Sequence, residues 1–169
     1  MRADIQSVLK TWERENETTL EVFARVPEGR NDQTVVPDKG WTLGGLVWHI
    51  CISERWFCAE VMGARPAGDN EVPADEVPAT VAEMTAAFRR SHAALVQAVA
   101  EQAMAERGEA WVDEAVDFYG NPWTRMELLN LMLRHEAHHR GQLSVLMMVA
   151  GGQPPTIYGA PGINLEDAL

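Results

Sequence analysis

Three of the five histidines in the chain lie within the stretch RHEAHHRGQL, from Arg134 to Leu143. Imidazole nitrogens bind transition metals, and two histidines four residues apart on a helix form a recurring metal clamp. His135 and His139 have this spacing. The letters also match H-E-x-x-H, in which Glu136 would be the base that activates a metal-bound water in a zinc peptidase. The stretch therefore predicts a metal site and leaves its chemistry open.

The positions of these side chains around a helix indicate what they can face. Each residue turns the helix by about 100°, so His139 lies about 40° from His135. By the same rule Gln142 lies about 20° to the other side, and His138 about 60° to that side. The same sector holds apolar residues, namely Leu128, Leu131, Leu146 and Val149. We therefore expect the histidines on the stripe that faces the interior of the protein, and Arg134, Glu136 and Arg140 off it.

The alternative is a structural role, in which core histidines form hydrogen bonds with their neighbours. For a single histidine on an apolar face this is the usual situation. Here two or three imidazoles would be buried together, at a cost of roughly a few kcal/mol each if unpaired. A cation that accepts their lone pairs removes this cost, so the cluster favours a metal site.

A first-row metal needs at least one more ligand. His49 is the best candidate, because it flanks the apolar face of another predicted helix, whereas Glu54 is less well aligned. Three protein ligands leave a position open for water or substrate, which is typical of catalytic sites; structural zinc sites have four ligands.

The context of the motif argues against a peptidase. The extended metzincin motif requires glycine seven residues after the first histidine, and this chain has Gln142 there. Another common form takes a downstream helical glutamate as the third ligand. The only later acids, Glu166 and Asp167, lie in a tail rich in Pro and Gly. No preceding strand is predicted that could hold an extended peptide.

Four long amphipathic segments must position these residues. Apolar residues recur every three or four positions, which predicts helices at about 4–26, 42–62, 80–106 and 124–150. Expected start signals are a cap at Asp4 and the capping boxes Thr80-Glu83 and Thr124-Glu127, and Gly151-Gly152 is a stop signal. Residues 107–123 predict a short hairpin or an irregular crossover. We expect an all-α four-helix bundle, one domain over 1–169, with a long crossover between the third and fourth helices.

The composition of the chain limits the classes of molecule that it can be expected to bind. The chain has 169 residues and a net charge of −11, with no basic run, which argues against nucleic-acid binding. There is neither an apolar signal core nor a run of about 20 apolar residues, so we expect no membrane contact and a cytoplasmic location. Cys51 and Cys58 are seven apart on one predicted helix, roughly 10 Å, too far for a disulfide, and we expect buried free thiols.

The combination of LVWHI, HEAHHRGQL and GGQPPTIYG resembles the DinB/YfiT-like family of metal-binding four-helix bundles. This is the damage-inducible family, distinct from the DNA polymerase that shares the name. The resemblance covers nearly the whole chain in helix order, and its most specific part is HxxxHRGQ. It implies a divalent metal, commonly zinc or nickel, held by His49, His135 and His139.

The resemblance also implies roles for the neighbours of these ligands. His138 becomes a packing residue beside the metal-binding histidines, and we expect Gln142 to donate a hydrogen bond to a ligand in the site. We expect Trp56 as a wall of the metal pocket, and Tyr158 is a candidate to fold back over the site. Arg140 is expected as an ion-pairing residue at the edge of the stripe.

Several relatives are S-transferases or isomerases that use a low-molecular-weight thiol such as mycothiol or bacillithiol. The resemblance thus implies a small-molecule substrate and, because the family is often dimeric, a homodimer. A bundle that binds a metal or small ligand without catalysis is the alternative, and a zinc peptidase or hydrolase is a further one.

Overall fold

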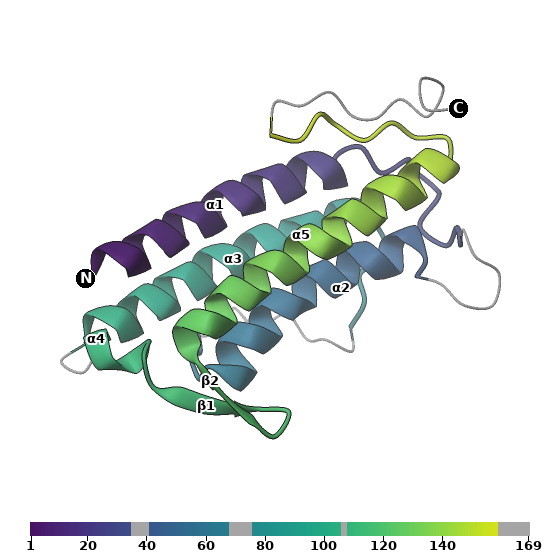
Figure 1. Cartoon of the computed structure of the whole chain (residues 1–169). Coiled ribbons are helices and arrows are strands. Elements are labelled where there is room, and N and C mark those ends of the chain that lie inside the picture. Colours follow the sequence, from purple (N-terminus) through teal and green to yellow (C-terminus); the bar gives the residue numbers. More distant parts are fainter. Residues whose placement is uncertain (35–40, 68–75, 106–107, 159–169) are drawn as a thin grey trace.

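Four long helices run side by side as a bundle (Figure 1), which confirms the predicted all-α fold. The computed structural model describes residues 1–34, 41–67, 76–105 and 108–158. The long helices are α1 (Ala3–Phe23), α2 (Leu43–Arg55), α3 (Val81–Met104) and α5 (Arg125–Val149). No helix in these ranges is long and apolar enough to span a bilayer.

Two of the helices begin at the predicted capping boxes. In α3 and α5 the threonine before the helix accepts a hydrogen bond from the third backbone N–H, and the glutamate at that position binds back to the threonine N–H. The prediction that Asp4 caps α1 was wrong. Arg2 occupies the capping position without a side-chain cap, and Asp4 lies inside the first turn. Asp4 instead favours the helix N-terminus by its charge, and it pairs with Arg2.

The second predicted helix is divided between two helical types. The regular helix α2 ends at Arg55, and the chain continues as a π-helix, η1 (Trp56–Val61). A π-helix has wider turns, because its N–H groups bind the carbonyl five residues back, and such segments are frequent at functional sites. The boundary has no sequence signal of its own, so periodicity predicted one helix over 42–62.

The crossover between α3 and α5 contains a hairpin, one of the two predicted alternatives. After the short helix α4 (Gly108–Trp111) come β1 (Ala115–Phe118) and β2 (Asn121–Thr124), paired antiparallel with Phe118 opposite Asn121. The two residues between the strands, Tyr119 and Gly120, both have positive φ, 53° and 78°. Figure 1 shows the hairpin at the end of the bundle where α5 begins.

The interior stripe of α5 differs from the prediction. Its buried residues are Leu128, Leu129, Met132, Glu136, Arg140, Leu143 and Met147. Glu136 and Arg140, expected off the stripe, are thus buried, whereas Val149, expected on it, is 57% exposed. His135 and His139 are half-buried on the flank of this stripe, and His138 is exposed. The predicted interior face of α5 was therefore rotated about the helix axis by roughly one residue. The cause is that two charged side chains occupy interior positions, where periodicity predicts apolar ones.

Both cysteines are free and buried, as predicted. Burial raises the pKa of each thiol well above its ordinary value. They therefore remain protonated and unreactive.

Candidate metal centre

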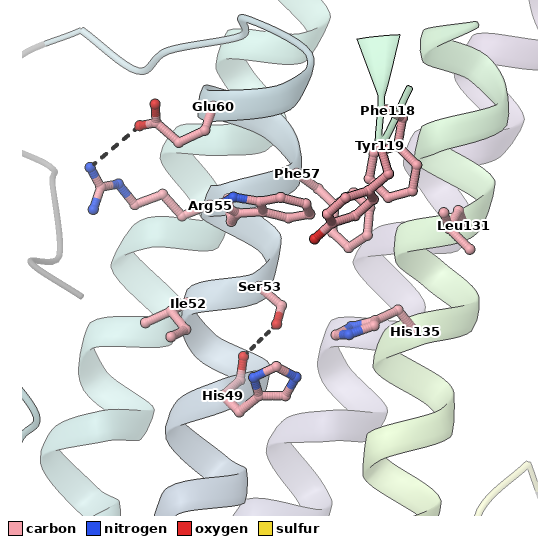
Figure 2. Close-up of a pocket in the computed structure, with 11 residues that line it drawn as sticks. His49, Ile52, Ser53, Arg55, Phe57, Glu60, Phe118, Tyr119, Leu131 and His135 are labelled. Carbon is pink, nitrogen blue, oxygen red and sulfur yellow. Dashed lines mark hydrogen bonds and ion pairs between the residues drawn. The ribbon is translucent and has the colours of Figure 1, made fainter. Parts of the chain in front are cut away.

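The three predicted ligand histidines converge on one point between α2 and α5. The Nε2 atom of His139 lies 3.1 Å from Nε2 of His135 and 3.2 Å from Nε2 of His49. All three residues offer a ligand atom within 4.8 Å of the others. Figure 2 shows the rings of His49 and His135 pointing toward each other from the two helices. The structure therefore brings the three residues together, and their role as metal ligands stays a prediction.

The spacing of these nitrogens fits a bound ion. Two imidazole nitrogens at about 2.0–2.1 Å from one metal lie roughly 2.9–3.4 Å apart for angles between about 90° and 109°. Both separations measured from His139 fall within that range. Hydrogen bonds alone satisfy the cluster less well, because one Nε2 lone pair accepts one proton and here faces two other rings.

Gln142 contacts the ring of His139 as an acceptor, whereas a donor role was expected for it. Its side-chain oxygen lies 2.7 Å from Nδ1 of His139. An amide oxygen only accepts, so Nδ1 carries the proton and Nε2 keeps its lone pair for the cluster. The side chain of Gln142 is exposed, and it acts at the outer edge of the site.

The electrostatic surroundings keep the imidazoles neutral. Burial, reinforced by His139 and His49, lowers the pKa of His135 to about 4. Burial also lowers the pKa of His49 and of His139. Metal ligation requires the neutral imidazole, so these side chains are in the required state at neutral pH.

A cavity of about 590 Å³ opens onto two of the histidines. His49 and His135 line it, together with Ile52 and Ser53 of α2 and Leu131 of α5. Its apolar part is completed by four aromatic residues, Trp56 and Phe57 from η1 and Phe118 and Tyr119 from the hairpin. Figure 2 shows this part of the cavity. Arg55 and Glu60 supply its charged residues. Its size and largely apolar lining are typical of small-molecule sites.

Comparison with known proteins agrees with the fold. A model of the DinB family matches residues 1–166. The chain belongs to the DinB family. It is 30% identical over 158 residues to the uncharacterized protein YrdA of Bacillus subtilis, covering 89% of this chain and 86% of YrdA.

Crystal structures of DinB-like proteins have the same fold. One from Bacillus cereus superposes with a TM-score of 0.75 at 27% identity, covering 90% of this chain and 97% of that one. YjoA from Bacillus subtilis superposes with a TM-score of 0.67 at 17% identity, covering 92% and 99%. At that identity YjoA supports the fold alone.

The other residues that were predicted around the three histidines lie in different places in the structure. Trp56 lines the cavity together with His49 and His135, and its role as a wall of a metal pocket stays a prediction. His138 is exposed and packs edge-on against the ring of His139. Glu54, the weaker candidate for the third ligand, is absent from the cluster. It is 1% exposed, accepts a hydrogen bond from Trp12 and contacts His92.

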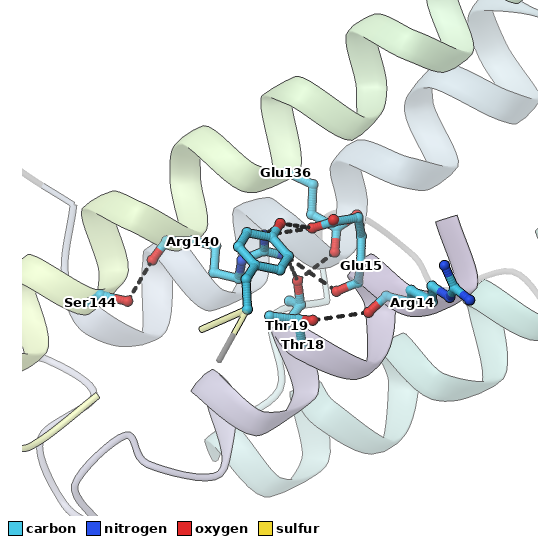
Figure 3. Close-up of polar contacts among 8 residues, drawn as sticks. Arg14, Glu15, Thr18, Thr19, Glu136, Arg140 and Ser144 are labelled. Carbon is cyan, nitrogen blue, oxygen red and sulfur yellow. Dashed lines mark hydrogen bonds and ion pairs between the residues drawn. The ribbon is translucent and has the colours of Figure 1, made fainter. Parts of the chain in front are cut away.

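A polar network that the sequence did not predict connects α5 to α1 (Figure 3). Thr19 donates to Glu136 at 2.5 Å, and Arg140 donates to Thr19 at 3.1 Å. Arg140 also donates to the carboxylate of Glu15 at 2.5 Å, so its predicted ion-pairing role is present, but inside the protein. The tail residue Tyr158 binds Arg140 and Glu15 with its hydroxyl, rather than covering the histidines.

Glu136 therefore lies on the wrong side for a peptidase base. Burial and the nearby Glu54 raise the pKa of Glu136 to about 8, which keeps the carboxyl protonated at neutral pH. Its Oε2 has no hydrogen-bond partner among the described residues. The residues that bind Glu136 and Arg140 come from α1 and from the tail, far away in the sequence. No local sequence pattern in α5 predicts these contacts.

Proposed function

We propose that this DinB-family chain binds one divalent transition metal, zinc or nickel, through His49, His135 and His139. We further propose that it is a thiol-dependent S-transferase, using a low-molecular-weight thiol such as mycothiol or bacillithiol. The observation that carries the proposal is the convergence of three Nε2 atoms at the end of a small-molecule cavity.

The chain's own residues support this chemistry. Three neutral imidazoles would leave at least one coordination position of a bound metal open. Two of the three, His49 and His135, line the cavity. A bound metal would lower the pKa of a coordinated thiol, so that it reacts as a thiolate. The apolar lining would exclude water from the electrophile, and Gln142 would hold His139 in the ligating tautomer.

Metal analysis tests the first half of the proposal. Protein purified without a histidine tag should contain about one metal ion per chain, and His49→Ala and His139→Ala should each lose most of it. His138→Ala is the matched control, because this exposed histidine on the same turn lies outside the cluster. Wild-type protein that takes up no metal, or equal content in all variants, would contradict the proposal.

Conjugation assays test the second half. The metal-loaded chain should join a thiol to members of a panel of electrophiles, with mycothiol or bacillithiol as donor, and His139→Ala should abolish the reaction. Metal uptake without conjugation by any donor would contradict the transferase and leave the metal site standing.

A non-catalytic bundle that binds a metal or small ligand is the second candidate. It is favoured by the scarcity of catalytic groups in the cavity. Among the described residues that line the cavity, Glu60 is the one carboxylate, and it already pairs with Arg65 at 2.7 Å. A transferase needs no further base if the metal alone activates the thiol, so the conjugation assay decides between the two.

A further inference from the structure

A cluster of four aromatic rings forms the part of the cavity beyond the histidines. Trp56 and Phe57 come from η1, and Phe118 and Tyr119 come from the hairpin. Ring centroids are 5.1 Å apart for Trp56 and Phe57, and 6.2 Å apart for Trp56 and Tyr119. The ring of Phe57 also meets the imidazole of His135 edge-on, at 5.6 Å. An aromatic surface therefore continues from the cavity mouth to the candidate metal centre (Figure 2).

The two outer rings are exposed to solvent. Trp56 is 39% exposed and Tyr119 is 80% exposed. Large aromatic side chains normally bury most of their area, and adjacent exposed ones mark binding surfaces. Both rings also line the cavity, whose volume is large enough for a small ligand.

The backbone at Tyr119 gives an independent indication. With positive φ at both Tyr119 and Gly120, the hairpin has the geometry of a type I′ turn. Asn or Gly is the usual residue at the first position, since a bulky side chain is strained in the left-handed region. A strained tyrosine at this position suggests that its ring has a use besides turn formation.

The charges at the rim favour an uncharged ring over a cation. An aromatic surface beside a carboxylate can bind ammonium groups. Here the carboxylate of Glu60 already faces two guanidinium groups, from Arg65 at 2.7 Å and from Arg55 at 3.9 Å. Its charge is therefore balanced by the protein.

We propose that the cavity binds the flat aromatic group of a small molecule against Trp56 and Tyr119, with the ligand's metal-binding atom at the three histidines. The inference rests on the proposed function for that second contact, and it names the substrate class as aromatic. The hairpin and the π-helix are then the specificity elements of the site.

Two probes with the same metal-binding group test the proposal. Acetohydroxamate and benzohydroxamate bind a metal through the same two oxygens. The first carries a methyl group where the second carries a phenyl ring. Metal-loaded wild-type protein should bind benzohydroxamate more tightly, on the order of 10-fold, from the apolar area of the ring. In Trp56→Ser and in Tyr119→Asn, most of this difference should disappear while the affinity for acetohydroxamate stays unchanged.

Tyr119→Asn also separates binding from folding, because Asn suits the left-handed position. Its thermal midpoint should equal or exceed that of the wild type. Val145→Asn, which removes an exposed apolar side chain of α5 outside the cavity lining, should leave both affinities unchanged.

Each other outcome has one meaning. Equal affinities of the wild type for the two probes would overturn the aromatic site and leave the metal site standing. Failure of the chain to take up metal, or of both probes to bind, would overturn the proposed metal function together with this inference. A variant in which both affinities fall alike would show that its ring supports the metal centre rather than the ligand.

Discussion

The side-chain oxygen of Gln142 lies 2.7 Å from Nδ1 of His139, one turn further along α5. This contact assigns the proton of His139 to Nδ1 and directs its lone pair to the other two imidazoles. Partners of this kind set both the orientation and the basicity of a ligating histidine.

Replacing Gln142 should therefore weaken metal binding without removing a ligand. We expect Gln142→Ala to lower the affinity about 10- to 100-fold. Gln142→Glu keeps an acceptor oxygen and should retain or increase the affinity. Competition with a chromophoric chelator measures both, and an unchanged affinity in the alanine variant would exclude this role.

Glu136→Gln examines the H-E-x-x-H motif directly. The oxygen of the amide can still accept from Thr19, and the native carboxyl is already neutral, since its pKa is raised to about 8. We expect unchanged metal content, unchanged conjugation activity and an unfolding free energy within about 1 kcal/mol of the wild type at pH 7. A peptidase base would instead contribute about 10²- to 10⁴-fold to the rate of peptide hydrolysis. Loss of such an activity in this variant would restore the peptidase hypothesis.

Arg140 should contribute strongly to stability. Its side chain is 2% exposed and donates to Glu15, Thr19 and Tyr158. Arg140→Met leaves the Glu15 carboxylate without its cationic partner, with only the Tyr158 hydroxyl still donating to it, and should cost about 3–5 kcal/mol. Tyr158→Phe removes only the hydroxyl contacts and should cost about 1 kcal/mol.

Urea denaturation of both variants measures these costs. Arg134→Met is the matched control, because Arg134 is exposed and its one partner in the described part of the chain is a backbone carbonyl of its own helix. Its cost should stay within about 0.5 kcal/mol. A similarly small cost for Arg140→Met would show that the network contributes no stability.

The capping box of α5 should make stability depend on pH in the acid range. Hydrogen bonds from Thr124 lower the pKa of Glu127 below its ordinary 4.5. The stabilisation from this carboxylate is therefore complete above about pH 4.5, the unfolded value, and is lost as the pH falls through the lower folded value. Glu127→Gln should be less stable than wild type at pH 7 and should approach it at low pH.

Thermal melts over a pH series follow this effect. Glu17→Gln, a change of an exposed carboxylate on α1, should run parallel to the wild type. Thr124→Ala, which removes the other half of the box, should cost about 0.5–2 kcal/mol at neutral pH. A difference between Glu127→Gln and wild type that is constant with pH would assign the effect to something other than the charge.

Local signals account for what the sequence predicted well. Capping boxes at Thr80 and Thr124 mark helix starts wherever the chain folds, and apolar periodicity marks the helices between them. The spacing of His135 and His139 is equally local. His49 required a further step, since only its place on a second helix, supported by the family resemblance, brought it to the others.

The errors share a different cause. The interior face of α5 includes Glu136 and Arg140, whose burial is possible only because α1 supplies Thr19 and Glu15. Nothing in the sequence of α5 itself indicates these partners, so its charged residues were predicted to lie on the surface. The π-helix after Arg55 likewise has no local signature, although it places Trp56 in the cavity.

Glu136 and Arg140 each directly follow a histidine of the cluster, and both are bound to α1. Rotation of α5 about its own axis would move these contacts apart together with the imidazoles. The network therefore fixes the rotation of α5 about its axis, and with it the spacing of the imidazole nitrogens. A metal bound as proposed would meet ligands held in place by contacts on the opposite side of the helix, so its binding should cost little ordering entropy.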